Sequence, residues 1–309
     1  MRYVVGYGAA DTGADAVALA VAIARAQSAS LDIVHVRRRS EPFNPSYPEQ
    51  DPGAERGGRP SPRTLLERAR SLVPDDVEAR THTRTASSFA EGLMTVAQQF
   101  DAELIIVGAA SSGLWSRFSV GTVADHLLHS SPVPVALAPR GYDAPRITRI
   151  SAAIGSRPGA QAVLDTGLAA AARRRVRLRL ISLLALGNVK DRPEARRHTQ
   201  RMLDEAAHTL PAAARVDTAI ATGKTIENAI DRMTWEPGDL VLVGSSRLAH
   251  GNRLFMGSTA SKMLRTLPVP MIVVPKSAAA LAADAVADAA ADAGSDAAGA
   301  DSNGTQRRS

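Results

Sequence analysis

An internal repeat constrains this chain more than any other feature of its sequence. The repeated segments are 104–108 and 240–244, 121–122 and 257–258, and 132–134 and 268–270. All three pairs have the same offset of 136 residues (244 − 108, 257 − 121, 268 − 132). Solenoid units repeat every ~20–50 residues, so this longer, ungapped offset indicates a duplicated domain.

The duplication continues toward the N-terminus with a different offset. Gly8 aligns with Gly155, and the strand-like run at 31–34 aligns with 178–181, an offset of 147 (155 − 8). Copy one therefore has 11 extra residues (147 − 136), and we place them in the Pro- and Gly-rich stretch 40–62. We expect two domains, copy one at 1–140 and copy two at 146–276. An Ala- and Asp-rich tail at 277–309, which we expect to be disordered, follows them.

Composition narrows the class of protein. The chain has no cysteine, which excludes disulfides and thiolate zinc sites, and no apolar run approaches the ~20 residues that span a bilayer. We expect a soluble cytoplasmic protein without a membrane partner. The net charge is +6, but aromatic residues make up only 4 % of the chain, so we do not expect nucleic acid as a partner. The arginines at 173–175, 177 and 179 are interpreted as a solvated helix end and strand face.

Short β-branched runs alternate with helical patterns in both copies, which predicts parallel strands joined by helical crossovers. The predicted strands are 2–7, 31–36, 77–83, 103–107, 133–138, 148–154, 176–183, 214–221, 239–243 and 269–274. The predicted helices are 13–28, 62–73, 87–99, 121–130, 158–174, 191–209, 223–234 and 257–266. The predicted fold class is α/β, with two tandem Rossmann-like doubly wound domains. Each would have a five-stranded parallel sheet of order 3-2-1-4-5, covered by helices on both faces.

The Pro-Val-Pro triplets indicate which strands join the two copies. Proline cannot donate to a strand ladder, so each triplet belongs at a strand start or on an edge. The last strand of each copy is then an edge strand. We expect the two domains to pair intramolecularly through these strands, and we keep a homodimer open as a further assembly.

The fourth helix of each copy predicts an anion site. Its first N–H groups and the positive end of its dipole point to the carboxyl ends of the strands. Gly121 and Gly257 permit close approach, and Thr122 and Ser258 add hydroxyl donors. The same two hydroxyls also fit a helix cap with no ligand.

These motifs resemble those of tandem universal stress proteins. Copy one has Val107-Gly108, the spacing to Gly121-Thr122, Arg117 within that loop and the closing Pro-Val-Pro strand. Copy two matches with Val243-Gly244, Gly257-Ser258, Arg253 and its own Pro-Val-Pro. Nucleotide-binding members of the family resemble G-x2-G-x9-G-S/T here. The resemblance implies a stress-response regulatory module that binds ATP or a related adenine nucleotide in this loop.

The chain departs from the family's pattern at the middle glycine and at the end of strand one. The middle glycine is Ser111 in copy one and Arg247 in copy two, and the family's aspartate after strand one falls on Gly8 and Gly155. Arg247 could contact a phosphate or fill the cleft. The resemblance implies these nucleotide-binding residues: Gly8, Val36, Val107, Gly108, Ser111, Gly121, Thr122, Val123, Gly155, Val243, Gly244, Arg247, Gly257, Ser258 and Thr259.

Several alternatives stay open. The ligand could be another small anion, or the chain could be a regulatory scaffold of the same fold whose clefts bind no nucleotide. The sequence leaves an accompanying Mg²⁺ undecided. We expect no dedicated enzyme and at most weak ATPase activity, because no complete catalytic set is present. A ligase-type enzyme of a related fold is the third hypothesis.

Three further motifs are incomplete. Gly223-Lys224-Thr225 ends like a P-loop, but Thr218 replaces the first required glycine. Gly6-Tyr7-Gly8 begins like a dinucleotide fingerprint, but Asp11 replaces its third glycine. His126 and His129 lie three residues apart on a predicted helix, yet no carboxylate repeats beside them in copy two, so we predict no metal site.

Overall fold

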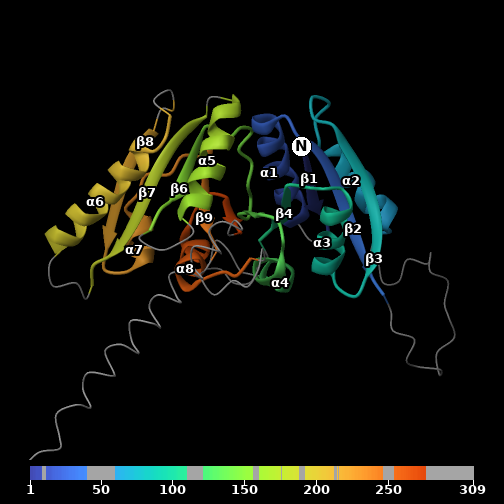
Figure 1. The fold of residues 1–309 in the computed structure, drawn as a ribbon. Helices are drawn as coiled ribbons and strands as arrows, with labels where there is room; N and C mark the ends of the chain where they lie inside the picture. The colour runs from blue at the N-terminus through green and yellow to red at the C-terminus, as the bar shows by residue number, and fades with distance from the viewer. Residues whose placement is uncertain are drawn as a thin grey trace, which may run out of the picture.

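The two copies form one continuous ten-stranded sheet (Figure 1). The structure is a computed structural model, and it describes residues 1–8, 12–39, 60–109, 121–155, 160–174, 176–187, 192–211, 214, 216–245 and 254–275. The strand order is β3 (Ala79–Ala86), β2 (Ser30–Arg38), β1 (Arg2–Gly6), β4 (Leu104–Gly108), β5 (Val135–Ala138), β10 (Met271–Val274), β9 (Asp239–Gly244), β6 (Arg149–Ala153), β7 (Arg177–Ala185) and β8 (Val216–Gly223). Each half has the predicted order 3-2-1-4-5, which confirms the fold class.

The halves join through the last strand of each copy, which follows the Pro-Val-Pro triplet. β5 and β10 pair antiparallel, with Ile272 opposite Ala136, whereas the other strand pairs of the sheet are parallel. Each Pro-Val-Pro triplet ends directly before its strand, where a missing amide does not interrupt the ladder. The predicted intramolecular pairing is confirmed.

Helices cover both faces of the sheet. One face carries α1 (Thr12–Gln27), α2 (Pro62–Ser71), α5 (Ala160–Arg174) and α6 (Arg192–His208). The other carries α3 (Phe89–Gln99), α4 (Thr122–Ser130), α7 (Ile226–Asp231) and α8 (Ser258–Thr266). The hydrophobic core on each face includes residues of both copies, so the halves share two common cores. In Figure 1, copy one runs from blue to green on the right and copy two continues to red on the left.

One helix is shorter than predicted. The sequence predicts a helix over 223–234, but α7 has six residues, and Gly223 is the last residue of β8. A Cβ at Gly223 would lie 2.5 Å from the amide nitrogen of Ala229, so the strand and helix approach too closely for a side chain. Thr225 caps α7 by accepting a bond from the amide of Asn228 at 3.3 Å. The P-loop-like triplet is therefore a strand end followed by a helix cap.

Candidate functional site

The starts of α4 and α8 are the centre of the predicted anion site. Their N-cap residues are Gly121 (φ −67°, ψ 159°) and Gly257 (φ −75°, ψ 167°), and neither helix has a side-chain capping bond. The cap interpretation of Thr122 and Ser258 is therefore wrong, because both are the first helical residue. By contrast, Ser88 caps α3 by accepting a bond from the amide of Glu91 at 3.1 Å.

The hydroxyl-bearing residues at these helix starts are open to solvent. Thr122, Ser258 and Thr259 are exposed, and Val123 is half-buried. A helix start with no side-chain acceptor presents backbone N–H groups and a partial positive charge. The exposed hydroxyls add donors at the same end, so each helix start can receive an anion.

The strand end beside α4 is a glycine for a packing reason. A Cβ at Gly108 would lie 1.9 Å from the carbonyl oxygen of Thr12, the first residue of α1. No side chain fits there, so this glycine is required by the fold alone. In copy two, Gly244 also ends its strand, and the amide of Ser245 donates to the carbonyl of Val274 at 2.8 Å.

Gly8 and Gly155 follow β1 and β6 and have no such constraint. A Cβ built at either position meets no atom of the described residues within 4 Å. Gly141 is the glycine with positive φ among the described residues, so the backbone at 8 and 155 suits other residue types. The loss of the family's carboxylate at these positions is therefore not imposed by packing.

Three of the valines that the resemblance implies for nucleotide binding have packing roles in this structure. Val36, Val107 and Val243 are all buried in the core beneath α3, α4, α7 and α8. Val36 lies against α3, where a Cβ at Gly92 would be 2.7 Å from its methyl carbons. Ser111 and Arg247, like Arg117 and Arg253, lie outside the described residues.

A polar contact that the sequence did not predict joins Ser245, after β9, to Phe255, before α8. The Ser245 hydroxyl accepts from the amide of Phe255 at 2.7 Å and donates to its carbonyl at 3.1 Å. The neighbouring amide of Leu254 donates to the Ser131 carbonyl of copy one at 2.9 Å. The rings of Phe255 and His129 meet edge to face, with centroids 5.1 Å apart. The segment before α8 therefore rests on copy one.

The arginine-rich run at the end of α5 is only partly a solvated face. Arg179 is buried, and its Nε donates to the Ser151 hydroxyl at 3.0 Å. Burial and the positive charge of Arg149 lower the pKa of Arg179. Arg149 itself makes two bonds to Asp239, at 2.7 and 2.6 Å. This cluster lies where β6 and β9 begin, at the opposite edge from the helix starts, so it belongs to the structure rather than to the site.

Two properties of the described residues bear on other functions. No group of three or more His, Cys, Asp or Glu side chains there could hold a metal ion. Over the same part of the chain, no helix has both the length and the apolar character needed to cross a bilayer.

The fold and the site define a tandem pair of Rossmann-like domains. In each domain a helix with a glycine N-cap begins at the carboxyl edge of the sheet. The chain belongs to the universal stress protein family, whose model matches residues 1–139 and 146–275. The two matches correspond to the two copies of the repeat.

Curated relatives and solved structures agree with this family. Universal stress protein Rv2319c of Mycobacterium tuberculosis and Universal stress protein Mb2346c of Mycobacterium bovis are each 32 % identical over 293 residues, covering 89 % of this chain and 100 % of the relative. A universal stress protein structure from Archaeoglobus fulgidus matches with a TM-score of 0.62 and 13 % identity, covering 89 % of this chain and 98 % of that one. The functionally unknown protein PA1789 of Pseudomonas aeruginosa matches with a TM-score of 0.61 and 16 % identity, covering 93 % and 96 %.

Proposed function

We propose that this protein is a cytoplasmic stress-response regulatory module that binds ATP or a related adenine nucleotide at the starts of α4 and α8. We take residues 1–140 and 146–276 as one binding unit each, followed by the tail at 277–309. The observation that carries the proposal is shared by both copies. This helix has a glycine as its N-cap, no side-chain capping bond, and an exposed hydroxyl residue in its first position. Phosphate oxygens are the acceptors that such a helix start favours.

The regulatory role rests on the link between the copy-two loop and copy one. A nucleotide at the start of α8 would sit next to the segment that bonds Ser131 and contacts His129. Ligand occupancy then changes the inter-copy contact, and with it the surface offered to a partner. Hydrolysis is not required, and we expect any ATPase activity to be slow.

The second candidate is a scaffold of the same fold that binds no nucleotide. It is favoured by Gly8 and Gly155, which remove a carboxylate that the fold has room to hold. The two candidates differ in what the purified protein carries. Mass spectrometry of the native protein would detect a co-purified adenine nucleotide under the first and none under the second.

A charge substitution at the helix start tests the site directly. Thr122→Glu and Ser258→Glu place a negative charge where it favours the helix dipole by ~0.3–1 kcal/mol but repels a phosphate. We expect the melting temperature without ligand to stay level or rise, while the shift produced by millimolar ATP, ADP, AMP or cyclic AMP is lost. Thr122→Gln and Ser258→Gln are the matched neutral controls and should keep most of the shift.

If none of the nucleotides shifts the melting of the unmodified protein, the scaffold is the better description. Equal shifts in the Glu and Gln variants would place any nucleotide elsewhere on the molecule.

A further inference from the structure

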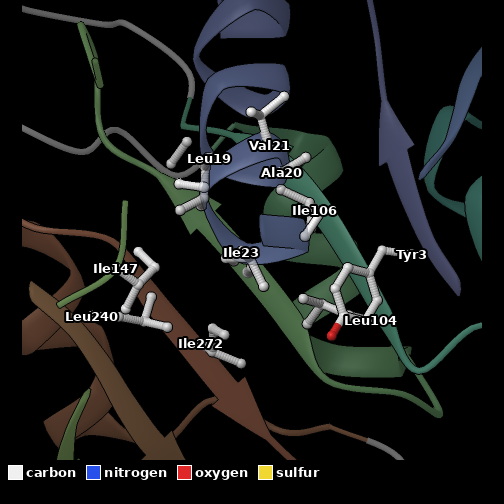
Figure 2. Packing of buried hydrophobic residues seen from close by; sticks show 14 of the residues in the cluster. Tyr3, Leu19, Ala20, Val21, Ile23, Leu104, Ile106, Ile147, Leu240 and Ile272 are labelled. Carbon is white, nitrogen blue, oxygen red and sulfur yellow. The ribbon is translucent and has the colours of Figure 1, made fainter. Parts of the chain in front are cut away.

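A cavity of about 400 Å³ lies between the two copies, on the sheet face that α1 and α5 cover. Its volume falls within the ~300–1,000 Å³ typical of small-molecule pockets. Figure 2 shows Ile147, Leu240 and Ile272 of copy two on one side and Tyr3, Ile23 and Leu104 of copy one on the other. Leu104 and Leu240 lie at the amino ends of β4 and β9, so this cavity is at the edge opposite the helix starts.

The cavity follows from how the copies are joined. α1 packs over β1 and β4, and α5 packs over β6 and β9, so the β5–β10 seam lies between the two helices. On this face β5 contributes only Ala136 and Ala138, which are too small to fill the space. Near their C-terminal ends the helices are joined by two bonds: Gln27 Nε2 donates to the Ala170 carbonyl at 3.0 Å, and Arg173 Nη1 donates to Gln27 Oε1 at 2.9 Å.

Tyr3 is a hydrogen-bond donor in the wall without a good acceptor. Its side chain is 4 % exposed, and its hydroxyl donates to the Met1 Sδ at 3.8 Å, a weak acceptor. Burial raises the pKa of Tyr3 to about 12, so the hydroxyl keeps its proton across the physiological range. A buried donor of this kind gains from an acceptor atom supplied by a ligand.

The charges at the mouth disfavour an ionic ligand. Glu103 and Asp165 line it together with two residues that carry a positive charge, the N-terminal Met1 and Arg173, whose Nη1 is already bonded to Gln27. An anion would meet two carboxylates, and any ion would lose hydration against walls of isoleucine and leucine. An uncharged hydrocarbon body loses no hydration energy of that kind, and it gains by contact with the same walls.

We propose that this cavity is a second ligand site for an uncharged, mainly hydrocarbon molecule that carries one hydrogen-bond acceptor, such as a cyclic ketone. Tyr3 donates to the acceptor oxygen, and the aliphatic walls of both copies enclose the hydrocarbon body. Because both copies supply the walls, the ligand stabilises their pairing and does not compete with a nucleotide at the other edge of the sheet.

The test uses the full chain and two probes of similar shape, 4-phenylcyclohexanone and phenylcyclohexane, measured by isothermal titration calorimetry. We expect both probes to bind, the ketone more tightly. Tyr3→Phe should weaken the ketone by roughly 2- to 10-fold, the range of one hydrogen bond, and leave the hydrocarbon unchanged. Tyr142→Phe is the matched control, because Tyr142 is also a buried tyrosine, its hydroxyl has no partner among the described residues, and it lies outside this cavity.

Filling the cavity tests its location. Ala26→Leu on α1 and Ala170→Leu on α5 should each abolish binding of both probes, with circular dichroism melting as the check on folding. Ala172→Leu on the exposed side of α5 is the matched control and should bind normally. Failure of the native chain to bind either probe would overturn the proposal. So would binding that survives both filling variants, or equal affinity of the native and Tyr3→Phe chains for the ketone.

Discussion

Copy one and copy two have an arginine at the same position but pair it with strands on opposite sides. Arg2 and Arg149 are equivalent, 147 residues apart at the starts of β1 and β6. In copy one the partner is Asp32 on β2, which also contacts His82 at 2.7 Å. In copy two the partner is Asp239 on β9, and the position equivalent to Asp32 is Arg179 (179 − 32 = 147).

This exchange shows what the fold requires at the start of its first strand. In the sheet Asp239 lies directly beside Arg149, whereas Asp32 lies beside Val4, two residues beyond Arg2. Residues two apart on a strand share a face, so a strand on either side can supply the carboxylate. The two clusters differ in burial: the Arg2 side chain is 35 % exposed, and that of Arg149 is 11 % exposed. The copy-two cluster should therefore depend more strongly on its carboxylate.

The largest predicted effect follows from that difference. Asp239→Asn keeps the volume but removes the buried carboxylate that faces Arg149 and Arg179, and leaves the half-exposed Glu236, 3.4 Å from Arg149, as the remaining ion-pair partner. Breaking a buried pair in this way costs about 3–5 kcal/mol. Asp32→Asn should cost about 1–3 kcal/mol, because Arg2 can turn to solvent. Urea unfolding followed by circular dichroism measures both losses. Equal losses, or a larger one for Asp32→Asn, would contradict the comparison.

The next effect concerns the carboxylate that both copies lack. Gly8→Asp and Gly155→Asp fit the open space at these positions. A charged acceptor there should tighten ATP binding by about 1.5–3 kcal/mol, roughly tenfold or more, if the proposed site is right. Calorimetry on each single variant also tells which copy holds the nucleotide. The Asn variants are controls for the charge, and unchanged affinity in both Asp variants would count against the site.

A smaller effect is specific to the copy-two loop. Ser245→Ala removes both bonds to Phe255, and the equivalent residue of copy one, Ala109 (245 − 109 = 136), has no hydroxyl to make them. We expect the amide of Leu254 to exchange with deuterium about tenfold faster, a local loss of ~1.4 kcal/mol. Ser130→Ala, which removes a hydroxyl that donates to the His126 carbonyl within α4, should leave this amide unchanged. An unaltered exchange rate of the Leu254 amide in the Ser245→Ala variant would show that the two bonds to Phe255 do not hold this segment in place.

The smallest effect is a pH dependence at α7. Bonds from its own backbone amide and from Thr225 lower the pKa of Glu227 below its ordinary 4.5. Its contribution to stability is therefore complete above pH 4.5 and is lost as the pH falls through the lowered, folded-state pKa. Because the residue is only half-buried and solvent screens its charge, Glu227→Gln should cost less than ~0.5 kcal/mol at pH 7.

Thermal melting at a series of pH values checks the Glu227 prediction. The difference in melting temperature between the native chain and the Gln variant should shrink toward zero once the pH is below the folded-state pKa. A difference that persists or grows in acid would contradict the lowered pKa of Glu227.

The sequence predicted the fold well because the informative signals are local and occur twice. Two copies of each strand and helix pattern, with prolines before the last strands, specify the sheet order and the seam. The burial of Arg179 was missed because an alternating pattern shows which residues share a face, not that Asp239, on a strand two places away, neutralises that face.

The site was predicted at the level of the element but not of the atom. Glycine followed by a hydroxyl residue correctly marked where α4 and α8 begin, yet Thr122 and Ser258 are not the caps. The contacts of Ser245 and Leu254, like the cavity between α1 and α5, depend on segments that are not neighbours in the sequence. A single sequence contains no periodic signal for such contacts.

The most direct test of the central claim is an ATP titration of the full chain followed by backbone amide shifts. Nucleotide binding at both helix starts should give saturable shifts at Thr122 and Val123 in copy one and at Ser258 and Thr259 in copy two, with Ser258→Glu abolishing only the second pair. Amides at these helix starts that do not move at millimolar ATP, or shifts confined to other parts of the sheet, would contradict it.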